Sequence, residues 1–125
     1  MTRQWVQFLP NFLPIFHVRL RSERILAMFD TGARMSLITG IRIAPFNLPV
    51  TAHRTIIDVF GGQTVVPVAM LSDVGFGSVT LPPFEVGIAP VAHFYLGTEL
   101  ILGINAFQDQ RLQIDLTAGQ LHLLP

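Results

Sequence analysis

Short apolar runs recur roughly every ten residues along the chain and are separated by clusters of glycine, proline and asparagine. Several runs alternate apolar with polar residues, which is typical of strands that bury one face. The pattern predicts an all-β domain, with strands at 14–20, 24–30, 35–39, 52–60, 63–71, 79–88, 111–116 and 119–124. One short helix is expected at 104–110 and a turn near 40–46. Pro82 and Pro83 interrupt the sixth strand, which indicates that this part lies at a sheet edge.

One of these runs leads directly into a carboxylate on a tight turn. Residues 25–29 are strongly apolar and end at Asp30-Thr31-Gly32-Ala33, in which Gly32 permits a sharp turn. A second apolar run follows, so we expect packing to hold Asp30 where strand becomes turn. Two such carboxylates about 3 Å apart can share one proton, so that one activates water and the other protonates a carbonyl. The chain has a single Asp-Thr-Gly, and a second carboxylate of this kind would therefore come from another copy of the chain across a two-fold axis.

The segments around this turn resemble the retropepsins and the retroviral-like aspartic proteases of cellular genomes. Upstream, LPIFHVRLRSERILAMFDTGARMSLIT is similar to the opening hairpin of that family, which runs into the catalytic turn. Downstream, ELILGINAF is similar to the second signature of the family, which implies that Ile101, Leu102 and Gly103 brace the turn from behind. The tail RLQIDLTAGQLHLL looks like a closing hairpin. The resemblance covers residues 12–124, nearly the whole chain.

The resemblance implies a fold and a set of catalytic residues. The expected fold is an all-β, retropepsin-like closed β-barrel subunit with one short helix, which forms a two-fold homodimer. Residues 1–125 would be one domain, with residues 1–11 as an extended N-terminal arm. The expected catalytic residues are Asp30, Thr31 and Gly32. The Thr31 hydroxyl is expected to reach across the two-fold axis to the partner's loop, and a bond to its own local backbone is the alternative.

A second segment is a candidate for closing over a bound peptide. The sequence IIDVFGGQTVVPV at 56–68 holds two β-rich runs joined at Gly61-Gly62, the composition of a two-residue hairpin with positive φ at both turn positions. In the family a glycine-tipped hairpin of this kind is the flap, and a plain surface hairpin is the alternative. The predicted substrate-binding residues are Ala33, Arg34, Phe60, Gly61, Gly62 and Gln63.

Arg34 and Ile104 depart from the family pattern. Retropepsins usually carry an acidic residue or serine at the first position and many carry arginine at the second, so the familiar ion pair cannot form here. Arg34 could instead bind a substrate carboxylate or pair with Asp109, Asp115 or Glu99. The sequence leaves these possibilities open, and the departure bears on substrate preference and on activity itself.

Composition favours the association of two copies. At 125 residues the chain has room for one core but not for the two lobes of a pepsin-like monomer. Half of the residues are hydrophobic and the mean hydropathy is +0.53, an apolar surplus that a subunit interface would absorb. Eight basic and eight acidic residues cancel without runs of like charge, which favours neither nucleic acid nor an anionic membrane as a partner. The predicted partners are a second copy of the chain and a peptide or protein substrate.

Other chemistries lack a motif. The four histidines are widely spaced without a metal-ligand pattern, so no metal and no cofactor is expected. Cysteine is absent, and neither Ser36 nor Ser72 lies in a nucleophile-elbow context. Pro10 and Pro14 interrupt the apolar N-terminal segment, which argues against a signal sequence or a membrane anchor. The compartment is unknown, and the cytoplasm is favoured because neither kind of segment is evident.

The predicted function is a homodimeric aspartic endopeptidase that hydrolyses peptide bonds with a water activated by the Asp30 pair. The alternative is a catalytically weak or inactive dimeric peptide-binding or dimerisation module of the same fold, as Arg34 could suggest. A domain excised from a longer polyprotein is a third possibility. The intact Asp-Thr-Gly-Ala favours the enzyme, because a pure binder has no need of paired carboxylates that repel one another.

Overall fold

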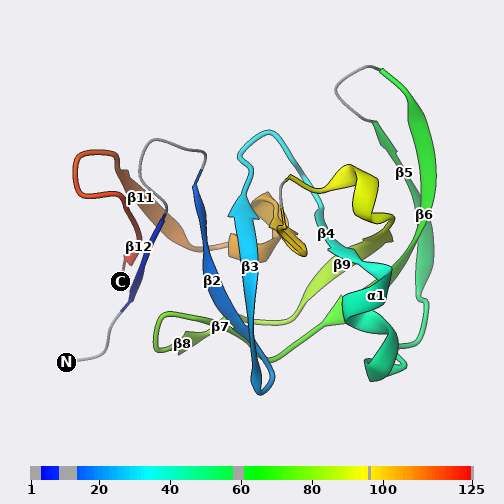
Figure 1. Cartoon of the computed structure of the whole chain (residues 1–125), viewed down its shortest axis with the longest axis horizontal. Helices are drawn as coiled ribbons and strands as arrows, with labels where there is room; N and C mark the ends of the chain where they lie inside the picture. The colour runs from blue at the N-terminus through cyan, green and yellow to red at the C-terminus, as the bar shows by residue number, and fades with distance from the viewer. Residues whose placement is uncertain (1–3, 9–13, 58–60, 96, 125) are drawn as a thin grey trace.

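The computed structural model describes residues 4–8, 14–57, 61–95 and 97–124, and within them the chain is mostly β-structure (Figure 1). The strands are β1 (Trp5–Gln7), β2 (Ile15–Leu20), β3 (Glu23–Phe29), β4 (Ser36–Thr39), β5 (Ala52–Ile57), β6 (Gln63–Leu71), β7 (Val74–Phe76), β8 (Val79–Thr80), β9 (Phe84–Ala89), β10 (Leu100–Leu102), β11 (Arg111–Asp115) and β12 (Gln120–Leu124). The helical elements are α1 (Gly40–Ile43) and the 3-10 turns η1 (Ala44–Phe46), η2 (Val91–His93) and η3 (Ile104–Phe107).

The described strands form two sheets. The larger sheet has the order β5-β6-β9-β4-β10-β3-β2-β7-β8, and the smaller has the order β1-β12-β11. In Figure 1 the smaller sheet and both chain ends lie at the left, whereas the β5–β6 hairpin stands at the right. The two sheets share one core, because Val6, Leu121 and Leu123 of the smaller sheet lie in the same buried cluster as Phe16 and Ile25 of the larger one.

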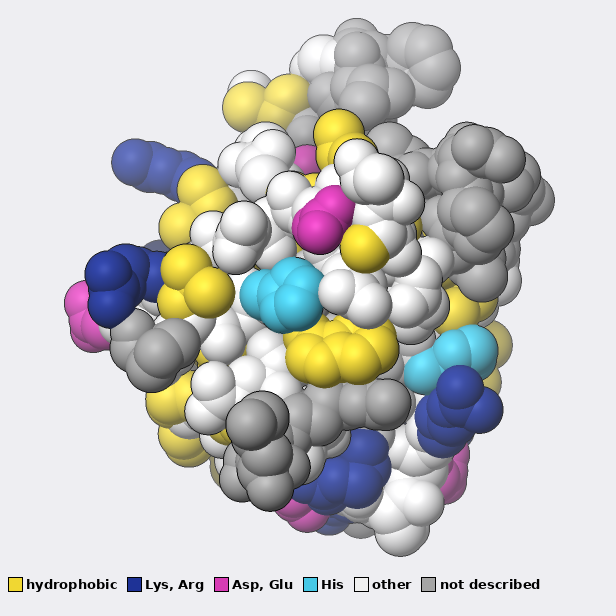
Figure 2. All heavy atoms as spheres, turned by 90° about the vertical axis from the view of Figure 1, so that its left-hand side faces the viewer, with side chains coloured by type: hydrophobic (Ala, Val, Ile, Leu, Met, Phe, Trp, Pro, Cys, Tyr) yellow, Lys and Arg dark blue, Asp and Glu magenta, His cyan; other side chains and the backbone are white. Residues whose placement is uncertain are grey.

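The outer face of the smaller sheet is mixed in character. The ring of Trp5 on β1 lies against that of His122 on β12, with 5.9 Å between ring centroids. Figure 2 looks onto this side of the molecule and shows apolar side chains scattered among polar ones, with arginine side chains toward the rim. This face therefore carries no continuous apolar surface among the residues that the structure describes.

The closed barrel that we expected is not formed. β5 and β8 end the larger sheet, and no strand pairing joins them within the described part of the chain. Closure requires two edge strands with free hydrogen-bonding groups side by side. Here β8 has only two residues and is soon followed by Pro82 and Pro83, which lack backbone N–H groups, so it offers almost no edge to pair.

The all-β class with one short helix is confirmed, but the helix lies elsewhere than predicted. The α-helix is α1, at the position where only a turn was expected, and the segment predicted as helix forms the single 3-10 turn η3. The sixth predicted strand is two strands, β8 and β9, that are separated at the prolines. Within the N-terminal arm, the described residues form β1, which pairs with β12, so this part belongs to a sheet.

A chain of phenylalanine rings links the core to the turn after β3. The rings of Phe16 and Phe76 meet edge to face, as do those of Phe76 and Phe107, and of Phe107 and Phe29. Their centroids are 5.3 to 5.9 Å apart, the favourable geometry for aromatic pairs. Because Phe29 is the last residue of β3, the core fixes the point at which the next residue, Asp30, leaves the strand.

Candidate active site

Asp30 lies where β3 passes into a turn. Its backbone N–H donates to the Leu102 carbonyl at 3.0 Å, and the Ala33 N–H donates to the Asp30 carbonyl at 3.2 Å. The carboxylate atom Oδ1 accepts from the Gly32 N–H at 2.8 Å. Oδ2 accepts no hydrogen bond from any described residue, and the side chain is half-buried. The turn thus orients the carboxylate and leaves one of its oxygens available.

β10 braces this turn from behind. It pairs in parallel with β3 and antiparallel with β4, so that Ile101 lies between Met28 and Leu37. Beyond β10, Gly103 passes very close to the turn: a Cβ atom here would lie 2.8 Å from the Ala33 carbonyl oxygen. The N–H of Ile104 then donates to that same oxygen at 2.8 Å. This arrangement agrees with the brace that the resemblance implied.

A polar network that the sequence did not reveal holds the residues that follow the turn, Arg34 and Ser36. The amide oxygen of Asn105 accepts from the backbone N–H and the hydroxyl of Ser36, at 2.9 and 2.8 Å. Its amide nitrogen donates to the Glu85 carbonyl at 2.7 Å, and its backbone N–H donates to the Arg34 carbonyl at 3.1 Å. The Ser36 hydroxyl in turn accepts from the Gly103 N–H at 3.0 Å. One side chain therefore joins η3, β4 and β9.

An apolar row crosses the sheet beside the turn. Met28, Ile101, Leu37, Gly87 and Val68 are direct partners on the neighbouring strands β3, β10, β4, β9 and β6, and directly opposed residues share one face. A Cβ atom at Gly87 would lie 2.8 Å from the Leu37 side chain, so the neighbours already fill this position. Met28 stands two residues before Asp30, which places this face next to the carboxylate.

The β5–β6 hairpin continues this face toward the predicted flap tip. Ile56 and Thr64 are paired across the hairpin, and Thr64 lies four residues before Val68 on the same face. The register of the hairpin differs from the predicted one, because Ile57 pairs with Gln63, whereas a two-residue turn at Gly61-Gly62 would pair position 60 with Gln63. Gly61 has a φ of +80°, whereas Gly62 does not have a positive φ. In Figure 1 the start of β6 and the turn after β3 lie toward the same, upper end of the molecule.

The structure places most of the predicted site residues around the turn and the hairpin. Thr31, Gly32 and Arg34 are exposed and Ala33 is half-buried. Gly61, Gly62 and Gln63 are exposed at the start of β6, and the predicted contribution of Phe60 lies outside the described residues. The Thr31 hydroxyl makes no hydrogen bond within the described chain, so the local bond considered from sequence is not formed there.

The structure separates Arg34 from the acidic partners considered for it. Glu99 accepts from the Arg42 guanidinium at 2.9 and 2.8 Å, and Glu23 also contacts Arg42. The Glu99 hydrogen bond raises the pKa of Arg42 above its ordinary value, against the effect of burial. Asp115 accepts from the Ala118 N–H at 2.9 Å, and no contact joins Asp109 to Arg34 among the described residues.

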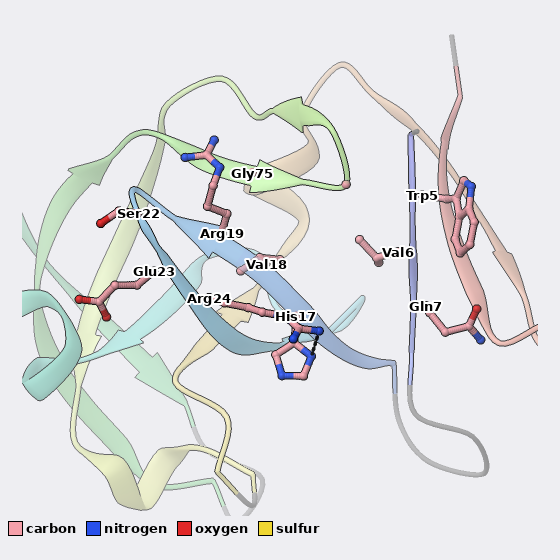
Figure 3. A pocket seen from close by; sticks show the side chains of 11 residues that line it. Trp5, Val6, Gln7, His17, Val18, Arg19, Ser22, Glu23, Arg24 and Gly75 are labelled. Carbon is pink, nitrogen blue, oxygen red and sulfur yellow. Dashed lines mark hydrogen bonds between the residues drawn. The ribbon is translucent and has the colours of Figure 1, made fainter. Parts of the chain in front are cut away.

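A hollow of about 490 Å³ lies apart from this site. It is bounded by β1 on one side and by the β2–β3 hairpin and β7 on the other (Figure 3). His17 and Arg24 point toward one another in it, with 3.2 Å between His17 Nδ1 and an Arg24 Nη. His17 is exposed at the rim of the hollow, and the partial desolvation of its ring there, followed by the charge of Arg24, lowers its pKa below the ordinary value. No lining residue belongs to the Asp30 turn or to the hairpin loop, so this hollow is not the predicted cleft.

The described residues also bear on metals and membranes. No three histidine, aspartate or glutamate side chains among them lie together as metal ligands would. None of the helices in the described ranges is long and apolar enough to cross a membrane.

Comparison with known proteins gives matches of sequence family and of fold. A family model of aspartyl proteases matches residues 16–106, which include the Asp30 turn, the hairpin and β10. A retropepsin-like aspartic protease from Rickettsia conorii has a similar structure, with a TM-score of 0.61, 16% identity, and coverage of 95% of this chain and 87% of the other. A search of curated proteins found no match.

Two further solved structures have the same retropepsin-like fold. The retroviral protease-like domain of Ddi1 from Leishmania major aligns with a TM-score of 0.57 and 16% identity, covering 100% of this chain and 96% of the other. The Simian Foamy Virus (mac) protease aligns with a TM-score of 0.53 and 14% identity, covering 75% and 91%. At these identities the likeness establishes the fold and not the activity.

Proposed function

Because the chain belongs to the aspartyl protease family, we propose that it is a homodimeric aspartic endopeptidase whose active site pairs the Asp30 carboxylates of two subunits. The observation that carries the proposal is the Asp30 carboxylate itself. It is half-buried on a turn that is braced by β10, with Oδ1 fixed by the Gly32 N–H and Oδ2 free of hydrogen bonds within the described chain. That oxygen is available to a water molecule and to a second carboxylate.

The proposed reaction needs one proton between the two carboxylates. The ionised carboxylate accepts a proton from water, and the water oxygen bonds to the peptide carbonyl carbon while the protonated carboxylate donates to the carbonyl oxygen. The resulting tetrahedral diol transfers a proton through the carboxylates to the amide nitrogen. The C–N bond then breaks and releases a carboxylic acid and an amine. No covalent bond forms to the protein.

Two features support the dimer. The chain supplies a single Asp-Thr-Gly, so one copy cannot furnish the pair of carboxylates. Exposed side chains near the turn also favour a partner: the Thr31 hydroxyl makes no hydrogen bond to any described residue, and Ile104, whose N–H is bonded to the Ala33 carbonyl, is 54% exposed. Burying such apolar side chains in an interface would remove them from water.

Two features support an extended peptide as the substrate. The half-buried side chains of Met28, Leu37 and Ile56 are proposed to form an apolar wall beside Asp30, which favours apolar side chains near the cleaved bond. The β5–β6 hairpin is proposed to act as the flap, closing over the peptide with Gly61, Gly62 and Gln63 at its tip. A strand-like peptide could then hydrogen-bond to backbone above and below it.

The substitution Asp30→Asn tests the chemistry. The amide keeps the shape of the side chain but cannot shuttle the proton, so peptide cleavage should fall by at least about 10²-fold. Cleavage of a diverse peptide library, read by mass spectrometry, measures the effect. Asp109→Asn makes the same change at an exposed carboxylate off the turn and should retain cleavage. Undiminished cleavage by Asp30→Asn would refute the proposal, and binding of peptides without cleavage by the unmodified protein would favour the peptide-binding module.

A further inference from the structure

Arg34 combines a fixed backbone with an unpaired side chain. Its carbonyl accepts from the Asn105 N–H at 3.1 Å, the neighbouring Ala33 carbonyl accepts from the Ile104 N–H at 2.8 Å, and Ser36 is bonded to the Asn105 side chain. The exposed Arg34 guanidinium makes no hydrogen bond or ion pair with any described residue. The described part of the chain therefore fixes the backbone of Arg34 and supplies no counter-charge to its guanidinium.

The other described arginines all have partners. Arg19, Arg42 and Arg54 pair with carboxylates, Arg21 lies over the Phe46 ring, Arg24 contacts His17, and Arg111 also interacts with another group. Glu99, Glu85 and Asp73 are the carboxylates of those pairs, so they already have arginine partners. Arg34 is thus distinguished among the described arginines by the absence of a partner among the residues that the structure describes.

We infer that Arg34 selects an acidic side chain in the bound peptide, so that the substrates are peptides with Asp or Glu near an apolar cleavage point. This inference rests on the proposed peptidase function. Arg34 lies four residues after Asp30, so the two Cα atoms are at most about 14 Å apart. An extended peptide advances about 3.3 Å per residue, which places the acidic residue within about four positions of the cleaved bond.

The physical basis is the planar, permanently charged guanidinium. Its fork of N–H groups matches a carboxylate, and such charge-assisted hydrogen bonds are stronger than neutral ones. A peptide that covers Arg34 with a neutral side chain removes water from the cation without supplying a counter-charge, which costs binding free energy. A two-fold dimer presents two such cations, one toward each end of the peptide. Acidic residues on both sides of the cleaved bond should therefore act together.

The experiment measures cleavage of matched peptides that differ only by Glu against Gln. Each has the same apolar centre, with Glu or Gln at successive positions up to four residues from the cleaved bond. The unmodified protein should show kcat/KM about twofold to fivefold higher for Glu at the favoured position, as expected for an ion pair with an exposed arginine. The preference should shrink as salt is raised, because screening weakens exposed charge pairs.

Substitutions at Arg34 test whether its side chain causes the preference for Glu over Gln. In Arg34→Gln the Glu-to-Gln ratio should fall to about one, whatever the absolute rate, and in Arg34→Glu it should invert in favour of peptides with Lys. Arg24→Gln removes another exposed arginine, which lies at the start of β3 and contacts His17, and it should keep the original ratio. A ratio that is unchanged in both Arg34 variants, or a ratio near one in the unmodified protein, would overturn the inference.

Two controls separate this inference from the function on which it rests. If no peptide is cleaved, the peptidase proposal fails, and fluorescence anisotropy of the same labelled peptides still tests whether Glu binds better than Gln and whether Arg34→Gln removes the difference. Sedimentation of Arg34→Gln tests the rival partner, an acidic group of the second subunit. A weaker dimer together with an unchanged Glu-to-Gln ratio would assign Arg34 to the interface and contradict the substrate role.

Discussion

Gly103 shows how a single missing side chain positions the Asp30 turn. A Cβ atom at this position would lie 2.8 Å from the Ala33 carbonyl oxygen and 2.9 Å from that of Met35. Both are backbone atoms, which cannot move aside without displacing the turn that carries Asp30. Only glycine lets the segment after β10 approach closely enough for Ile104 to bond to the turn.

We therefore predict that Gly103→Ala destabilises the protein by about 1 to 3 kcal/mol, the usual range for overpacking a filled site. Urea unfolding measures the change, and peptide cleavage should fall in parallel because the turn is displaced. Gly40→Ala is the matched control. A Cβ atom there meets Ile88 at an ordinary 3.6 Å, so its stability should be close to that of the unmodified protein. Equal stability of the two variants would show that the close approach is not a constraint.

His17 should make stability depend on pH. Partial desolvation of the ring, and then the charge of Arg24, lowers the pKa of His17 in the folded protein, so the folded state prefers the neutral ring. The contribution to stability is complete above the unfolded pKa of about 6.5 and is lost as pH falls through it toward the lower folded value. His17→Gln should therefore lose less stability than the unmodified protein between pH 7.5 and pH 5. Urea unfolding at both pH values tests this, with His53→Gln as the control on β5.

Among the elements, η3 contributes most through the side chain of Asn105. This side chain bonds to Ser36 on β4 and to the Glu85 carbonyl on β9, so three elements depend on one amide. Asn105→Ala should lower the free energy of unfolding by about 1 to 3 kcal/mol, because the backbone N–H of Ser36 and the Glu85 carbonyl lose their partners. Gln113→Ala, at an exposed position on β11, is the control. Stability equal to that of this control would mean that water replaces the amide at no cost.

Alternating strands could be predicted from the sequence because burial of one face leaves a period of two. β2, β3, β5 and β6 begin within about two residues of the predicted positions. β10 was not predicted as a strand, because three apolar residues that are all buried leave no period to detect. The helix α1 did have a signal: Thr39 caps it by accepting from the Arg42 N–H at 3.3 Å.

The candidate site could be predicted only in part, because a short motif reveals only residues that are close in sequence. Asp30, Thr31 and Gly32 lie together in sequence, so a short motif identifies them. The Ser36–Asn105 network joins residues 69 positions apart, and neither residue type is distinctive alone. The closed barrel was wrong because edge pairing depends on where β5 and β8 lie in space, which no local pattern encodes.

At the scale of the whole molecule, the proposed function requires two chains. Thr31 is proposed to hold the catalytic turns together, since its hydroxyl has no partner among the described residues. Thr31→Val should weaken dimerisation by about 1 to 3 kcal/mol, the cost of leaving the partner's polar groups unsatisfied. Sedimentation measures the dissociation constant, and Thr55→Val on the exposed face of β5 is the control. A dissociation constant unaltered by Thr31→Val would leave the hydroxyl without a role in the interface.

The threading of β10 between β3 and β4 also sets an order of folding. Residues 100–102 pair with residues 27–29 and 37–38, so the contacts that hold the Asp30 turn close a loop of about seventy residues. Such contacts of high sequence separation form late, because the chain must first lose much of its freedom. During synthesis the Asp30 N–H can bond only to water or to other transient acceptors until Leu102 has left the ribosome. The Asp30 turn would thus gain its native brace only after residue 102 has been made.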